Sequence, residues 1–256
     1  MGFGLPLANG GFMAAHIRHR LLTLFSSVCL LCAGQAQGER LLGAATSLNN
    51  NGDLLTNRHV VDGCDSLAIR TQESPTPLAA QLIGKSRKFD LAVIRASGHK
   101  PTSVVWLSVS PQKYVYVPTP GMKLLYGGPD SAAGADMSVN IGNGQAAEGS
   151  KDIYVSWMRS DAGLEASGSG VFDHSGSMVG VLFSVAQNYY RRTARENFYG
   201  ENLVRFYNNN NSVTEFLQKE LSEARVEIFY RTDPAPANGM VVKGQIFNAT
   251  AFVICQ

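Results

Sequence analysis

The stretch SDAGLEASGSGVFDHSGSMVGVL runs from Ser160 to Leu182 and places two serines, Ser167 and Ser169, in alternation with glycine. Glycine permits the tight, exposed turn that a nucleophilic serine requires, with its oxygen projecting and backbone amides converging nearby. Two strand-like apolar runs follow at once, separated by a His-Ser-Gly turn. The stretch therefore predicts a β-hairpin inside a folded domain and not a flexible linker.

A pattern of short apolar runs between turn residues surrounds this hairpin, from about residue 41 to about residue 186. The chain has 256 residues with 26 glycines, and only 16% of its residues are charged, which favours a loop-rich β protein over a helical bundle. Many short strands at this spacing predict an all-β fold, a barrel or a sandwich. The expected strands are Leu41–Leu48, Asp53–Val61, Ser66–Thr71, Ala79–Ile83, Leu91–Ala96, Val104–Leu107, Tyr114–Val117, Met122–Tyr126, Ile153–Met158, Gly170–Phe172 and Met178–Ser184.

A helix is expected after these strands, because Ser212–Glu215 has the sequence of a capping box and the apolar residues from Val213 to Leu221 fall on one face. The tail, residues 222–256, is too short for a typical second domain, and its role is unknown. Within it, Arg225–Arg231 and Met240–Val253 are expected to form strands around a proline-rich turn.

The first 36 residues are expected to be an export signal. Positive charge at Arg18 and Arg20 precedes a short apolar run, Leu21–Cys32, and small residues follow as far as Ala36. The run is too short to span a bilayer as an ordinary helix, so no stable membrane anchor is expected, and the mature chain is expected in the periplasm or outside the cell. Met13 would open a leader of more usual length, so residues 1–12 are interpreted as an over-long gene start.

Cleavage after Ala36 would leave two cysteines, Cys64 and Cys255. In an oxidising compartment they could form a disulfide, and the alternative is two unpaired buried cysteines. The net charge of +2 gives no indication of nucleic-acid binding. The sequence contains no Cys/His cluster with metal-ligand spacing and no glycine-rich phosphate loop, so neither a metal nor another cofactor is expected.

Two further stretches could carry chemistry. In Leu54–Val61 a strand delivers His59 into a short turn, and imidazole is the side chain that titrates unaided near neutral pH. In Lys88–Ile94, Asp90 stands at the head of an apolar run, where a partly buried carboxylate needs a partner such as a histidine N–H. Taken singly, each could equally be structural, as a core histidine or a strand-capping aspartate.

Taken together, the three stretches resemble the trypsin-like serine peptidases, and most closely the bacterial HtrA-like branch. That branch carries Leu-Thr-Asn-x-His-Val-Val, Asp-Leu-Ala-Val and Ser-Gly-Gly blocks in this order. Here they appear as Leu55–Val61, Asp90–Val93 and Ser167–Ser169. The resemblance covers roughly residues 41–221 and implies a peptidase domain at 37–221 with two six-stranded β-barrels and a C-terminal helix. Too few residues follow Leu221 for the PDZ domain that HtrA proteins usually add.

The resemblance also implies roles and positions for the site residues. His59 would be the general base and Asp90 its partner, both in a first barrel made mostly from residues 41–100. Ser167 would be the nucleophile, in a second barrel from about residue 102 to 187, with the backbone amides of Glu165 and Ser167 as the oxyanion hole. Glycines at the family's offsets favour Ser167, whereas the spacing from Ser160-Asp161-Ala162 fits Ser169 better.

The chain departs from the family at Glu165, which stands where the family has glycine. Two functions therefore stay open: an endopeptidase acting on protein or peptide substrates, and a catalytically inactive binding module with a defective oxyanion hole. Asp161 lies six residues before Ser167, where trypsin has the aspartate that selects Arg or Lys, and a structural loop role is the alternative. Residues from Ser184 to Ala186 are expected to form a wall of the substrate pocket.

Overall fold

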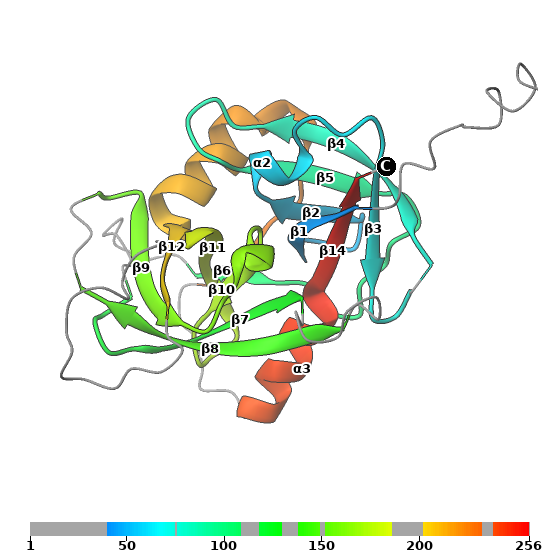
Figure 1. Ribbon diagram of the computed structural model, residues 1–256. Coiled ribbons are helices and arrows are strands. Elements are labelled where there is room, and N and C mark those ends of the chain that lie inside the picture. Colours follow the sequence, from blue (N-terminus) through cyan, green and yellow to red (C-terminus); the bar gives the residue numbers. More distant parts are fainter. Residues whose placement is uncertain are drawn as a thin grey trace, which may run out of the picture. The chain divides into compact units, whose positions relative to one another are not determined.

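The computed structural model describes residues 40–74, 76–108, 118–129, 138–148, 152–185, 202–231 and 238–255. The expected signal peptide, the strand expected at Tyr114–Val117, and Ala186 in the expected pocket wall lie outside these residues. The described residues belong to one folded unit, Glu39–Gln256, and form two β-barrels (Figure 1).

The first barrel is closed by six strands in the order β1-β14-β3-β4-β5-β2. Its interior is filled by small and branched side chains such as Ala45, Ile69, Ile94 and Val253, none of which is solvent-exposed. Five of its strands were expected, but the one expected at Asp53–Val61 is wrong in its second part, because the strand ends at Thr56 and Arg58–Val61 form the short helix α2. The sixth strand, β14, comes from the tail. The strands are β1 (Arg40–Ser47), β2 (Asp53–Thr56), β3 (Leu67–Thr71), β4 (Leu78–Lys85), β5 (Ala92–Ala96) and β14 (Thr250–Cys255).

The strand expected at Met240–Val253 is wrong in its first part, because residues Gly239–Ala249 form helix α3 and only then does β14 begin. The side chain of Asn238 accepts a hydrogen bond from the amide of Met240 (2.9 Å) and caps the helix. Strand β14 pairs antiparallel with both β1 and β3. Cys64 and Cys255 form a disulfide, with their Cα atoms 5.3 Å apart, which ties the end of β14 to the segment after β2.

The second barrel runs in the order β10-β7-β8-β9-β12-β11 and is closed by pairing between β10 and β11. Strands β6 and β13 extend this sheet beyond β11 with parallel pairing. The expected class, an all-β fold with two six-stranded barrels and a C-terminal helix, is therefore confirmed. The strands are β6 (Trp106–Ser108), β7 (Lys123–Pro129), β8 (Val139–Ala147), β9 (Val155–Ser160), β10 (Gly170–Phe172), β11 (Ser177–Val185), β12 (Asn202–Asn208) and β13 (Phe229–Arg231).

The expected helix is present, but the capping box is wrong. Helical turns begin at Asn209 and continue through η3 (Asn209–Val213) and η4 (Phe216–Glu220), followed by the short turn η5 (Ser222–Ala224). The side chain of Asn208 caps the start by accepting from the amide of residue 211, whereas the hydroxyl of Ser212 donates to the carbonyl of Tyr154 (2.6 Å). An earlier asparagine thus takes the capping position that the sequence pattern assigned to a serine.

One apolar cluster joins the two barrels. It contains buried residues of the first barrel, such as Leu55 and Val93, and of the second, such as Phe172 and Val181. The helical segment after β12 adds its buried residues, among them Phe216, to the same cluster. This shared core fixes the edge of the first barrel against the second, where the residues expected to carry chemistry lie.

Candidate active site

His59 stands on the single-turn helix α2 (Arg58–Val61), which begins two residues after the end of β2. Val60 and Val61 of this turn are buried, and His59 is turned outward with 47% of its side chain exposed. The side chain of Asn57, which precedes the turn, donates to the carbonyl of Asp90 (2.8 Å). The packing of the two valines and this hydrogen bond therefore present the imidazole to solvent beside Asp90.

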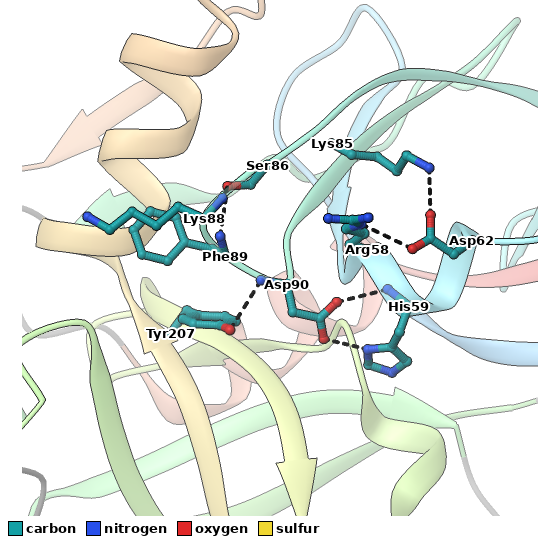
Figure 2. Close-up of polar contacts among 9 residues, drawn as sticks. All are labelled: Arg58, His59, Asp62, Lys85, Ser86, Lys88, Phe89, Asp90 and Tyr207. Atoms are coloured by element: carbon teal, nitrogen blue, oxygen red, sulfur yellow. Dashed lines mark hydrogen bonds and ion pairs between the residues drawn. The ribbon is translucent and has the colours of Figure 1, made fainter.

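Asp90 contacts His59 through both carboxylate oxygens. Oδ1 accepts from the backbone amide of His59 (2.8 Å), and Oδ2 lies 2.5 Å from the imidazole Nδ1 (Figure 2). This hydrogen bond to Asp90 raises the pKa of His59 above its ordinary value. With Nδ1–H directed at the carboxylate, the other ring nitrogen, Nε2, is left as the basic one.

The loop that carries Asp90 is fixed by hydrogen bonds within the loop and by one hydrogen bond to the second barrel. The hydroxyl of Ser86 accepts from the amides of Lys88 (3.1 Å) and Phe89 (2.9 Å), which fixes the turn. The amide of Asp90 donates to the hydroxyl of Tyr207 in β12 (3.1 Å; Figure 2). The carboxylate is therefore positioned by contacts on both sides of the junction between the barrels.

The helical segment after β12 adds a second set of contacts to this loop. The carboxylate of Glu220 accepts from the hydroxyl of Ser86 (2.7 Å) and from the amide of Arg87 (2.7 Å). Lys88 forms an ion pair with Glu215 (3.2 Å). Sequence reasoning missed these supporting residues, because glutamates on a helix have the pattern of an ordinary solvated face.

Three exposed charged residues, Arg58, Asp62 and Lys85, form ion pairs at α2. Asp62 accepts from Arg58 (3.1 Å) and from Lys85 (2.5 Å), and the pKa of Asp62 is lowered chiefly by the bond to Lys85 (Figure 2). The negative charge of Asp62 also contributes, after Asp90, to the raised pKa of His59. These pairs connect α2 to the end of β4.

The two candidate serines differ in accessibility. Ser167 follows the turn η1 (Leu164–Ala166) and is partly exposed, whereas Ser169 is 0% exposed. The hydroxyl of Ser169 has no hydrogen-bond partner among the residues that the structure describes. Gly168 between them has φ +88°, a conformation that favours glycine. Ser167 is therefore accessible to solvent, whereas Ser169 is not.

The turn at Ser167 packs against strand β1, next to the helix that carries His59. The amide of Ala44 donates to the carbonyl of Ser167 (2.8 Å). A Cβ added at Gly43 would lie 2.6 Å from this carbonyl oxygen and 2.9 Å from Val60 of α2. Gly43 therefore lies between the serine turn and the His59 turn, and the two approach each other because this position has no side chain.

Glu165 lies in η1, where the amide of Ala166 donates to the carbonyl of Gly163 (3.2 Å). The Glu165 side chain is exposed, and its carboxylate folds back over Gly163, where an added Cβ would collide with Oε2. The residue that replaces the family's glycine is thus part of a tight helical turn directly before Ser167.

Asp161 lines a pocket that is separate from the expected catalytic residues. Its Oδ1 accepts from the hydroxyl of Tyr126 (2.8 Å), and burial together with this contact raises the pKa of that tyrosine. The pocket, of about 660 Å³, lies between α3 and strands β7, β8 and β9, and its lining includes neither His59 nor Ser167. Ser184 lies in β11, and only its backbone belongs to the described part of the chain.

No group of three or more His, Cys, Asp or Glu side chains in the described ranges could hold a metal ion. Among the helices in those ranges, none has the length and apolar character needed to cross a membrane.

Comparison with known proteins identifies relatives of this arrangement. A model of the trypsin-like peptidase domain matches residues 43–181. A probable periplasmic serine endoprotease DegP-like of Pseudomonas savastanoi pv. phaseolicola is 30% identical over 158 residues, which cover 58% of this chain and 31% of that protein. The corresponding protein of Halomonas elongata is 27% identical over 153 residues, covering 58% and 30%. The chain thus spans less than a third of the length of these curated relatives.

A solved structure also shares the fold. The HtrA-type protease AlgW with decapeptide matches with a TM-score of 0.52 and 19% sequence identity. The match covers 71% of this chain and 52% of that one. At this identity the likeness concerns the arrangement of the two barrels.

Proposed function

Because the chain belongs to the trypsin-like peptidase domain family, we propose that it is an exported serine endopeptidase that hydrolyses proteins or peptides through an acyl-enzyme. The observation that carries the proposal is the double contact of Asp90 with His59, at the amide and at Nδ1. An ordinary surface histidine has no need of a carboxylate that contacts both its backbone amide and its ring. The partly exposed Ser167, on a turn packed beside α2, supplies the group that such a pair would activate.

In the proposed mechanism, the Ser167 hydroxyl attacks the carbonyl carbon of the scissile bond while Nε2 of His59 takes its proton. Asp90 keeps the imidazole proton on Nδ1 and stabilises the imidazolium that forms. The oxyanion of the tetrahedral intermediate would be bound by the amides of Glu165 and Ser167. His59 then gives the proton to the leaving amine, and water releases the acyl group from Ser167 by the same steps.

The proposal includes export to the periplasm or the outside of the cell. A charged and apolar leader supports it, as do the names of the periplasmic relatives and the Cys64–Cys255 disulfide. Disulfides persist in oxidising compartments and are rare in the cytosol.

The alternative is an inactive binding module on the same scaffold, and Glu165 is the observation that favours it. A residue with a side chain replaces glycine in the turn η1, and the amide of Ala166 is already used within that turn. In this alternative, the side chain at position 165 keeps the turn from directing the Glu165 amide at the oxyanion, which would then lack one donor. Loss of one such donor costs about 10²–10³ in kcat.

The test is labelling of the purified chain with a fluorophosphonate serine probe, with the adduct located by mass spectrometry. We expect an adduct on Ser167 that disappears in Ser167→Ala and His59→Ala and persists in Ser169→Ala. An adduct on Ser169 would show that Ser169 is the nucleophile and that the proposed role of Ser167 is wrong. No adduct in a folded chain, together with gain of labelling in Glu165→Gly, would favour the inactive binding module.

A further inference from the structure

We propose that the pocket between α3 and the second barrel is a binding site for a short acidic peptide segment, separate from the candidate active site. The pocket encloses about 660 Å³, a volume typical of ligand sites. Its lining comes from β7, β8, the end of β9, the turn at His174 and the first turns of α3. His59, Asp90 and Ser167 are not part of this lining.

The pocket exists because α3 packs along the outside of β7 and β8 (Figure 1). Val242 and Ile246 are buried in the shared core, and an added Cβ at Gly127 of β7 would lie 2.8 Å from Ile246. This contact fixes one side of the helix against the sheet. The neighbouring face of the helix, with Gly239 and Lys243, is left as one wall of the pocket.

The opposite wall is a row of polar side chains across three strands. Lys123 of β7 pairs with Gln145 of β8, and Gln145 pairs with Arg159 of β9, so the three residues lie side by side. All three are exposed and line the pocket. Because neighbouring strands are 4.7–4.9 Å apart, the backbones of Lys123 and Arg159 are separated by about 10 Å.

The charges in the lining are predominantly positive. Lys123, Arg159 and Lys243 face a single carboxylate, that of Asp161, which already accepts from Tyr126. Neither Lys123 nor Lys243 forms an ion pair with another residue in the described ranges. Anionic groups would therefore be attracted to this pocket.

Two features favour a peptide over a small anion. The backbones of Lys123 and Arg159 are about 10 Å apart, which matches acidic residues three positions apart in a polyproline II segment, where such residues share one face and the chain rises about 3.1 Å per residue. The side chain of Asn143 and the side-chain oxygen of Gln145 can bond to a peptide backbone, while the amide nitrogen of Gln145 donates to the carbonyl of Gly121.

The test measures binding by isothermal titration calorimetry with the peptide acetyl-Ala-Glu-Leu-Ala-Glu-Ala-amide. The chain carries Ser167→Ala so that the peptide is not consumed, and the result is therefore independent of the proposed activity. We expect binding that weakens with added salt and falls about tenfold or more in the double variant Lys123→Glu/Lys243→Glu. The same peptide with Gln in place of both Glu residues should bind about tenfold more weakly or not at all.

The matched control is Lys100→Glu/Lys219→Glu, which makes the same change of net charge at exposed lysines outside the pocket. It should retain the affinity within about twofold, and thermal unfolding should confirm that both double variants are folded. Equal loss in the control, equal binding of the Gln peptide, or no binding would overturn the proposal. So would binding of inorganic phosphate alone that depends on Lys123 and Lys243 when the peptide does not bind.

Discussion

At the scale of single residues, Asp90 sets the protonation of His59. Its hydrogen bond to Nδ1 raises the pKa of the imidazole, so the neutral form, which would accept the proton of Ser167 in the proposed mechanism, predominates only above that raised value. The His59–Asp90 pair also makes the stability of the fold depend on pH, and it stabilises the fold most at low pH. Because the folded pKa is raised, the stabilisation is fully present below the pKa of unfolded histidine and is lost as the pH rises through the folded pKa.

The first prediction concerns this pair. In Asp90→Asn, the pKa of His59 should fall, because the amide cannot stabilise the imidazolium, and kcat should decrease by about 10⁴, as it does for this change in a Ser-His-Asp triad. An NMR titration of the His59 ring would measure the pKa whether or not the chain is active. Asp62→Asn is the control and should lower the pKa much less. An unchanged pKa in Asp90→Asn would contradict the assigned contact.

A second prediction at this scale concerns the turn between the two serines. Gly168 has φ +88°, and an added Cβ would collide with the carbonyl of Ala44 and lie 2.5 Å from Thr56. The backbone strain of alanine at this positive φ costs about 1–3 kcal/mol, and the collision adds to it. Gly168→Ala should therefore lower the free energy of unfolding by more than this strain alone. The matched control is Gly98→Ala, where φ is +82° and the Cβ would meet nothing within 4 Å. Urea denaturation would compare them, and equal losses would mean that the close contact with β1 is absent.

At the scale of elements, sequence patterns predicted those strands whose apolar residues alternate or are bounded by clear turns, such as Gly170–Phe172 and the strand that precedes His59. They missed β8, because asparagine and glycine interrupt its apolar pattern, and β12, because Arg205 interrupts its apolar run and asparagine stands at both ends. In both strands the partners on either side supply the sheet contacts. The valines at the start of α3 favoured a strand, yet Val242, Ile246 and Ala249 are buried at helical spacing. The packing of Tyr207 and Glu220 against the Asp90 loop had no signal in the sequence, since it joins segments distant along the chain.

The contacts of Glu220 give a prediction for the helical segment after β12. Glu220→Gln should lower the free energy of unfolding by about 1–3 kcal/mol, because a carboxylate that accepts from both Ser86 and Arg87 is replaced by a neutral amide. Chemical denaturation measures this change. Glu223→Gln, an exposed residue of η5, should change stability by no more than about 0.5 kcal/mol. If both variants behave alike, the Asp90 loop is not supported from this segment.

At the scale of the whole molecule, the two barrels and their order were predicted from the resemblance to trypsin-like peptidases that the His, Asp and Ser blocks carry, whereas the strand pattern alone predicted only a barrel or a sandwich. The closure of the first barrel by β14 could not be predicted. Pairing of β14 with β1 and β3 joins residues about 200 positions apart, and nothing in a local pattern specifies such a partner.

The disulfide gives the prediction at this scale. Cys64 and Cys255 are separated by 191 residues in sequence, so their link restricts the unfolded chain strongly. Cys255→Ser should lower the free energy of unfolding by about 2–5 kcal/mol, measured by urea denaturation. A reductant should produce a similar loss in the unaltered chain and no further loss in the variant. Insensitivity of the unaltered chain to reductant would contradict a stabilising link.

The late position of β14 in the sequence has a consequence for biosynthesis. The ribosome makes β1 and β3 early, but the barrel that carries His59 and Asp90 can close only when β14 has been synthesised. A nascent chain without β14 would therefore have an open first barrel. Under the proposed export and activity, this order of synthesis would delay hydrolysis until β14 has been made and has joined β1 and β3.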